Sequence, residues 1–163
     1  MDKELLKKII YEAKSKKIKP ITILIDFDGT CTTHEFPKIG KNIGAQKVLK
    51  KLTDAGHKLI LFTMRSDGQQ KDPKGVNVKS SKTDYLTQAI KWFADNNIPL
   101  YGIQTNPTQH TWTSSPKAYG ELIIDDICLG IPTTTKYKGN ILSKKPFVDW
   151  AAVEKLLQEK GLI

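Results

Sequence analysis

The chain has 163 residues, a formal net charge of +9 and two cysteines. This length fits one domain with a single core and is too short for two domains of comfortable size. No apolar run of about 18 residues occurs, and the first ten residues lack a secretory pattern, so we expect a cytoplasmic protein without membrane contact. Cys31 and Cys128 lack the spacing of a disulfide framework or a metal site, which predicts two reduced thiols.

The basic charge permits a polyanionic partner such as a nucleic acid, but it does not require one. Arg65 is the sole arginine among 26 basic residues, and the guanidinium group is the one suited to bidentate contacts with bases and phosphates. Sequence-specific DNA recognition is therefore disfavoured. Seven lysines lie in residues 1–19, where apolar residues recur at helical spacing. We interpret this segment as a lysine-rich helix with a solvated face, in preference to a binding patch.

In the first half of the chain, strand and helix patterns alternate. Residues 21–25, ITILI, are β-branched and nearly continuous, which predicts a buried strand. A helix is predicted over 44–55, where apolar residues form one stripe and Gly56 follows as a cap. A second strand is predicted over 57–63. Residues 66–80 are polar and broken by glycine and proline, which predicts an exposed loop that can move.

The second half continues the alternation. Ser81 and Asp84 have the spacing of a capping box and predict the start of a helix. Strands are predicted over 100–104 and 121–125, and a closing helix over 146–160. We therefore predict one α/β domain spanning the whole chain, a three-layer sandwich in which helices cover both sides of a central parallel sheet.

Functional groups in such a sheet lie beyond the carboxyl ends of the strands. The predicted strand ends carry polar residues at this edge: Asp26 and Asp28, then Thr63, then Gln104, Thr105 and Asn106, and finally Asp125 and Asp126. Magnesium prefers oxygen ligands and is bound by one or two carboxylates together with a phosphate oxygen. Asp26 and Asp125 suit the carboxylate role. Asp28 returns to the same side of the extended chain, where its backbone carbonyl can also meet the metal.

A hydroxyl and an ammonium group are predicted at the same edge. Thr63 can donate to a phosphate oxygen, and Lys117, eight residues before Asp125, can neutralise both a carboxylate and a phosphate. An aspartate can attack phosphorus to form an aspartyl-phosphate, while a second carboxylate moves the protons. These parts together predict phosphoryl transfer.

The motifs DFDGT, LILFTMR, a lysine ahead of the last strand and IIDD resemble, in order, the four motifs of the haloacid dehalogenase superfamily. A lone D-x-D also occurs in glycosyltransferases and Toprim domains, but the resemblance here spans residues 21 to about 132. The resemblance implies these roles: Asp26 as nucleophile and metal ligand, Asp28 as general acid/base and carbonyl ligand, Thr63 as phosphoryl-binding residue, Lys117 as charge-holding residue, Asp125 as metal ligand and Asp126 as its support. The second aspartate of DFD resembles the phosphatase branch, so dehalogenation is not expected.

In this family, inserts after motif one or between motifs two and three build cap domains. The 15 residues of 29–43 suffice only for a short loop, and a helix and a strand use about half of the 53 residues between Thr63 and Lys117. The resemblance therefore implies a capless or minimally capped member with an open site. Either a large substrate, such as a phosphorylated nucleic-acid end or a phosphoprotein, covers the site itself, or a homo-oligomer or the 66–80 loop closes over a small phosphorylated molecule.

Some residues near these motifs have two interpretations. Arg65 lies two residues beyond Thr63 and is predicted to contact substrate, whereas for His34 a substrate contact and a local hydrogen bond are equally favoured. Glu35 is a further candidate contact. For Trp112 and Tyr119, packing beneath a strand is favoured over stacking on a substrate ring.

The sequence thus predicts a magnesium-dependent phosphomonoester hydrolase. The alternatives are a polynucleotide-end phosphatase and a non-catalytic module that binds phosphate or nucleic acid.

Overall fold

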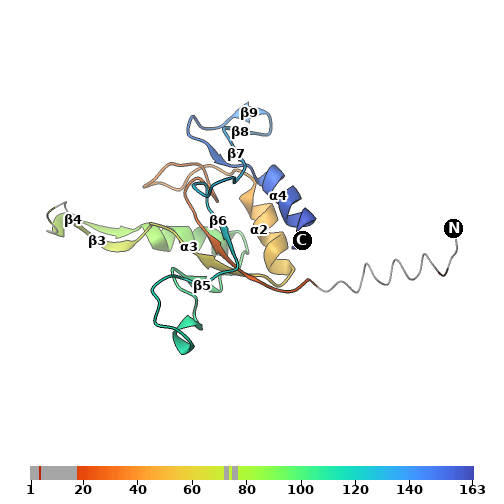
Figure 1. Cartoon of the computed structure of the whole chain (residues 1–163). Helices are drawn as coiled ribbons and strands as arrows, with labels where there is room; N and C mark the ends of the chain where they lie inside the picture. Colours follow the sequence, from red (N-terminus) through yellow and green to blue (C-terminus); the bar gives the residue numbers. More distant parts are fainter. Residues whose placement is uncertain (1–3, 5–17, 72–73, 75–76) are drawn as a thin grey trace.

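The structure is a computed structural model that describes residue 4, residues 18–71, residue 74 and residues 77–163. The helix predicted over residues 1–19 falls almost entirely outside these described residues. The described part is an α/β protein with a parallel central sheet and three helices, as the alternation of patterns predicts (Figure 1).

Four parallel strands form the central sheet in the order β5-β2-β1-β6. Their bounds are β1 (Thr22–Ile25), β2 (Lys58–Leu61), β5 (Gly102–Ile103) and β6 (Leu122–Ile124). The register places Leu24 of β1 beside Ile60 of β2 and Ile123 of β6. All four predicted strands are present, although each is shorter than predicted. Because β1 lies between β2 and β6, residues that follow it meet residues that follow both neighbours.

All three helices pack on one face of this sheet. They are α2 (Ala45–Asp54), α3 (Tyr85–Asp95) and α4 (Trp150–Glu159). Ile23, Ile25, Leu59 and Leu61 alternate to this face and are fully buried. Their core cluster includes the apolar stripes of the helices, namely Val48, Leu49, Leu52, Ala89, Phe93, Trp150, Val153 and Leu157.

The opposite face carries a smaller cluster of Leu24, Ile60 and Ala118, with Tyr101 packed against it. Within the described residues, the predicted second helical layer is replaced by the connection between β5 and β6, which contains only a short 3₁₀ helix, η1 (Gln109–Thr111). Two prolines and a glycine in residues 104–120 prevent a longer helix there. Ile123 consequently remains 44% exposed. The prediction of helices on both faces is therefore wrong for this part of the chain.

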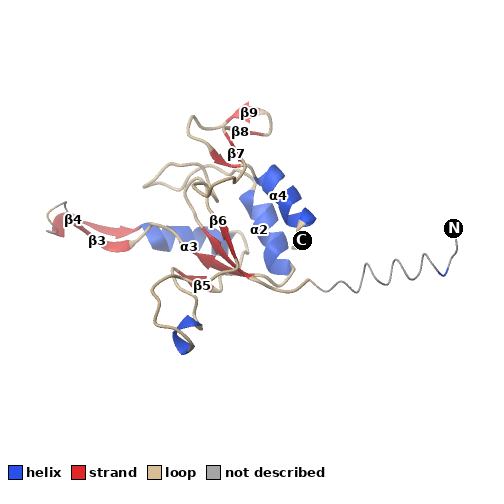
Figure 2. Ribbon diagram, in the orientation of Figure 1, coloured by secondary structure: helices blue, strands red, loops and turns tan. Residues whose placement is uncertain are grey.

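The segment predicted as an exposed loop over 66–80 forms an antiparallel hairpin instead. Its strands are β3 (Asp67–Lys71) and β4 (Asn77–Asp84), with an irregular register between Gln69 and Lys71. Figure 2 shows this hairpin extending away from the central sheet beyond α3. Both strands are polar and lack the apolar alternation of a half-buried strand, so the sequence did not reveal them.

The start of α3 also differs from the prediction. The proposed capping-box residues, Ser81 and Asp84, lie in β4, and Asp84 makes no side-chain capping bond. Asp67 of β3 caps the helix instead, because its Oδ1 accepts hydrogen bonds from the backbone amides of Leu86 (2.8 Å) and Thr87 (3.0 Å). The hairpin thus brings a carboxylate to the positive end of the helix dipole.

Small two-stranded pairings follow β6. β7 (Thr133–Thr134) pairs with β10 (Phe147–Val148), and β8 (Lys136–Tyr137) pairs with β9 (Asn140–Ile141). The closing helix, α4, begins after Asp149, whose side chain accepts hydrogen bonds from two amides of the first turn. None of the helices in the described ranges has the length and apolar content needed to cross a bilayer.

We predict that Asp67→Ala lowers the melting temperature by a few degrees, because two amides at the start of α3 lose their acceptor. The pKa of Asp67 is lowered by its hydrogen bonds from Thr87, so this contribution is present above the unfolded pKa and fades as pH falls through the lowered folded value. Thermal denaturation at pH 7 and pH 3 measures both effects. Asp84→Ala is the matched control, and an equal loss from it would contradict the assignment of Asp67 as the cap.

Candidate active site

Three carboxylates meet at the carboxyl edge of the sheet. Asp26 follows β1, and Asp125 and Asp126 follow the neighbouring strand β6. Each offers a carboxylate oxygen, and these oxygens all lie within 4.8 Å of one another. The backbone amide of Asp26 donates to the carbonyl of Ile124 at 3.0 Å, which continues the ladder between the strands up to the carboxylates. The structure thus brings together Asp26 and Asp125, as predicted, and adds the side chain of Asp126.

Thr30 links two of these residues. Its hydroxyl donates to Asp26 Oδ2 at 2.9 Å and accepts from the backbone amide of Asp126 at 3.0 Å. Thr30 is fully buried, and its carbonyl accepts a 2.7 Å hydrogen bond from the indole of Trp150 in α4. The sequence analysis did not single out Thr30, although it lies within the DFDGT motif.

The surroundings of Asp26 favour its protonated form. The pKa of Asp26 is raised to about 7, mainly by burial and to a smaller extent by the charges of Asp125 and Asp126, while hydrogen bonds from the Phe27 amide and Thr30 oppose the rise. Burial also raises the pKa of Asp126, against the opposing effect of His34. Three partly buried carboxylates without a compensating cation are costly, and their hard oxygen atoms are the ligands that a divalent cation such as Mg²⁺ prefers.

His34 contacts the same cluster. Its Nε2 lies 2.9 Å from Asp126 Oδ2, and the two side chains are 16% and 13% exposed. The ring lies against Gly29, where an added Cβ would approach Nε2 to 2.0 Å, and Gly29 also has a φ of +86°. Glycine is therefore required there both by the close contact and by the backbone. The hydrogen bond of His34 is not the local one that was predicted as an alternative, because its partner lies 92 residues away in the acidic cluster. Glu35 accepts from the Thr33 hydroxyl at 3.0 Å.

The side chain of Asp28 is bound by Arg65 and is not part of the acidic cluster. Its two carboxylate oxygens accept hydrogen bonds from Nε and Nη2 of Arg65, both at 2.7 Å. The Arg65 side chain is 1% exposed and also donates to the carbonyls of Pro37 (3.2 Å) and Lys38 (2.8 Å). This buried guanidinium, which makes four hydrogen bonds within the protein, does not fit the substrate contact predicted for Arg65. The Asp28 side chain is not part of the group that could hold a metal.

Thr63 lies beyond β2 and is 9% exposed. Its hydroxyl oxygen accepts from the Arg65 amide at 3.2 Å, which leaves the hydroxyl hydrogen available for an acceptor. Gln104, beyond β5, accepts from the Thr63 amide at 3.1 Å and donates to the carbonyls of Thr63 and Arg65. The predicted strand-end residues Thr63 and Gln104 thus hold each other in place.

Lys117 is not brought to the carboxylates. It is exposed on the second face of the sheet, and in the described part of the chain no ion pair joins its ammonium group to an acidic residue. It lines a hollow of about 350 Å³ together with Trp112, Tyr119 and Ile123. Trp112 and Tyr119 pack edge to face at 5.4 Å and are 59% and 46% exposed, so the prediction that they pack beneath a strand is wrong.

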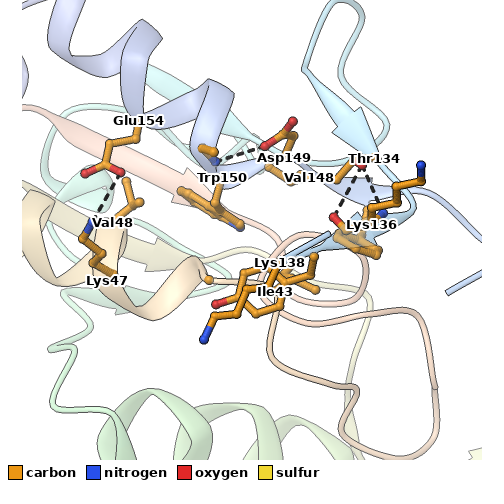
Figure 3. A pocket seen from close by; sticks show the side chains of 14 residues that line it. Ile43, Lys47, Val48, Thr134, Lys136, Lys138, Val148, Asp149, Trp150 and Glu154 are labelled. Atoms are coloured by element: carbon orange, nitrogen blue, oxygen red, sulfur yellow. Dashed lines mark hydrogen bonds and ion pairs between the residues drawn. The ribbon is translucent and has the colours of Figure 1, made fainter. Parts of the chain in front are cut away.

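A second hollow, of about 340 Å³, is lined by residues of α2, α4, β7, β8 and β10 (Figure 3). Several of its polar side chains have partners within the protein: Glu154 pairs with Lys47 at 3.8 Å, Thr134 accepts from the Lys136 amide, and Asp149 caps α4. None of the three carboxylates of the candidate site lines it. We therefore assign its contacts to the packing of α4 rather than to a ligand.

Both cysteines are free thiols, as predicted. Cys31 is fully buried, and its Sγ donates to the carbonyl of Asp26 at 3.2 Å. Burial raises the pKa of the Cys31 thiol well above its usual value, so this sulfur packs beneath the site as a neutral group.

The fold and the site define an α/β protein with a parallel sheet and an acidic cluster at its carboxyl edge. A solved structure, described as that of a conserved protein coded by a locus from Bacteroides thetaiotaomicron, is similar to it at 27% sequence identity and a TM-score of 0.62. The match covers 87% of this chain and 93% of the other. No family model matches the sequence, and no curated protein matches it.

We predict that, without divalent cations, Asp26→Asn makes the protein more stable than the wild type at pH 8 but not at pH 4. Because the folded state holds the Asp26 proton up to about pH 7, the wild type loses stability as pH rises from about 4 to about 7, by at most about 4 kcal/mol. Urea denaturation in chelator measures the difference. Asp95→Asn, at an exposed ion pair with Lys91, is the control, and a gain that does not depend on pH would contradict the explanation.

Proposed function

We propose that this chain is a magnesium-dependent phosphomonoester hydrolase that acts through an aspartyl-phosphate, with the HAD-like fold and chemistry that its motifs resemble. The observation that carries the proposal is the meeting of Asp26 with Asp125 and Asp126 at the carboxyl edge of the sheet. Thr63 follows β2, which pairs with β1 on the side opposite β6. A phosphoryl group bound at Asp26 would therefore lie between the carboxylates that follow β6 and the hydroxyl group of Thr63.

The carboxylate oxygens of the acidic cluster are ligands of the kind that magnesium prefers. Asp26, Asp125 and Asp126 supply carboxylate oxygens, and the charges of Asp125 and Asp126 add to the effect of burial in raising the pKa of Asp26. When bound there, Mg²⁺ would neutralise this charge and polarise a phosphoryl oxygen. Thr30 would keep the Asp26 carboxylate oriented, since its hydroxyl donates to Asp26 Oδ2 and is itself held by the backbone amide of Asp126.

In the proposed reaction, Asp26, Asp28 and Thr63 have separate roles. A carboxylate oxygen of Asp26 attacks phosphorus, the bond to the leaving oxygen breaks, and the leaving oxygen takes a proton from Asp28. Asp28 next removes a proton from water, whose oxygen attacks phosphorus and releases the Asp26 carboxylate and inorganic phosphate. The Thr63 hydroxyl donates to a phosphoryl oxygen in both steps.

The proposal leaves the site without a cap domain. The β3–β4 hairpin, which lies between Thr63 and Lys117, extends away from the sheet (Figure 2). Met64 and Ile127, which follow site residues, are 98% and 84% exposed. Such an open edge admits a phosphorylated small molecule or the phosphorylated end of a nucleic acid, the substrate classes we propose. Closure by a homo-oligomer stays a prediction.

We expect the purified protein to hydrolyse p-nitrophenyl phosphate with magnesium and to lose this activity in chelator. Asp26→Asn should abolish turnover because an amide oxygen cannot supply the attacking carboxylate. Release of nitrophenol is the measurement, and circular dichroism confirms that the variant is folded. Asp54→Asn, on the exposed end of α2, is the control. Full activity of Asp26→Asn would contradict the assignment of Asp26 as the nucleophile.

Lys117 gives a separate test, since the motif resemblance and the geometry disagree about it. Because its exposed side chain lies on the second face of the sheet, we predict that Lys117→Ala retains turnover within about tenfold of the wild type. Lys91→Ala, at an exposed position on α3, is the matched control. A loss comparable to that of Asp26→Asn would instead support the charge-holding role implied by the motifs.

A further inference from the structure

The connection between β5 and β6 exposes two aromatic side chains on the second face of the sheet. Trp112 and Tyr119 pack edge to face with their ring centres 5.4 Å apart, and they remain 59% and 46% exposed. Both residues line each of two hollows, one of about 350 Å³ and one of about 430 Å³. An exposed aromatic pair shared by two hollows offers ring surface to planar groups of a ligand.

Buried amide side chains anchor this connection. Gln109 is 8% exposed and donates to the carbonyls of Ser115 at 2.9 Å and Lys117 at 2.7 Å. Its side-chain oxygen accepts from the Tyr119 amide at 2.7 Å. Asn106, also 8% exposed, donates to the Tyr119 carbonyl at 3.1 Å. The backbone that carries Tyr119 is thus fixed by the protein itself, which lowers the cost of ordering it around a ligand.

The hollow of about 350 Å³ lies on the face of the sheet that leads to the acidic cluster. Leu24 of β1 and Ile123 of β6 line it, and these two residues are paired in the sheet. Asp26 and Asp125 follow them by two residues, and alternate residues of a strand share a face. Two residues of strand span roughly 7 Å, so one substrate can place a ring in this hollow and its phosphate at Asp26.

Exposed lysines flank both hollows. Lys117 lines the first, and Lys58, whose Nζ lies 4.4 Å from the ring centre of Tyr101, lines the second. In the part of the chain that the structure describes, neither ammonium group forms an ion pair. The acidic residue of the second hollow, Glu121, accepts a 2.6 Å hydrogen bond from the Thr22 amide. Exposed rings beside ammonium groups suit a ligand that carries both planar bases and phosphates.

We propose that this face binds the end of a single-stranded nucleic acid, with the terminal base in the first hollow and the next base in the second. The inference rests on the proposed function, in which the terminal phosphate binds at Asp26, and it names the substrate class. The two hollows favour a strand over a mononucleotide, which would fill only one of them. Because every base has a ring face that can stack, binding tolerates many base sequences.

The test compares substrates with and without bases, using release of inorganic phosphate or nitrophenol. The substrates are oligothymidylates phosphorylated at the 5′ or the 3′ end, thymidine monophosphate and p-nitrophenyl phosphate. We expect Trp112→Ala to lower kcat/KM on the preferred oligothymidylate about 5- to 150-fold relative to kcat/KM on p-nitrophenyl phosphate, the range for loss of one stacked base. Trp112→Phe should recover most of the loss, because it keeps a ring face. Ile141→Ala, at a 73% exposed apolar residue of β9, is the control.

Binding is measured separately, by fluorescence anisotropy of a labelled oligothymidylate in chelator. We expect the dissociation constant to rise several-fold between about 50 and about 200 mM salt and to be weaker for Trp112→Ala than for Ile141→Ala. Equal losses of Trp112→Ala on all substrates, or equal kcat/KM on the mononucleotide and the oligothymidylates, would overturn this inference and leave the proposed function standing. Absence of turnover on every substrate would overturn the proposed function, and the binding measurement would then decide this surface.

Discussion

The mutual repulsion of Asp26, Asp125 and Asp126 is the constraint around which this structure is organised. Parallel pairing of β1 with β6 forces the residues after both strands to the same edge, so the carboxylates cannot separate without breaking the sheet. Burial is the largest cause of the raised pKa of Asp26, and the charges of Asp125 and Asp126 add to it. A fold that serves stability alone would place neutral residues there, which is why the cluster indicates a function.

The groups that hold the cluster come from distant parts of the chain. Thr30 bridges Asp26 and the amide of Asp126, and Trp150 of α4 secures the Thr30 carbonyl across 120 residues of sequence. His34 reaches Asp126 because Gly29 leaves space for its ring. The packing of α4 in the core therefore supports the orientation of the predicted nucleophile, although no residue of that helix belongs to the acidic cluster.

Sequence patterns predicted the parts of the molecule that depend on burial and topology. The four strands and the meeting of Asp26 with Asp125 follow from apolar runs and parallel order. The hairpin of β3 and β4 was missed because its strands are polar, and the cap at Asp67 because it acts on amides about 20 residues away. The prediction of a second helical layer was wrong for a different reason. The alternation of strands and helices suggested a covering helix on this face, but the prolines of residues 104–120 allow only a loop with a short 3₁₀ helix.

The side-chain partners of the two aspartates in DFDGT could not be predicted from the sequence. Their spacing predicts that both reach the same edge, but it carries no information about what each one meets there. Asp26 lies among other carboxylates and a hydroxyl, whereas Asp28 lies against a buried guanidinium. Two identical side chains only two residues apart therefore lie in environments of opposite charge. Arg65 makes this difference, and it does so across 37 residues of sequence, where no local motif could reveal it.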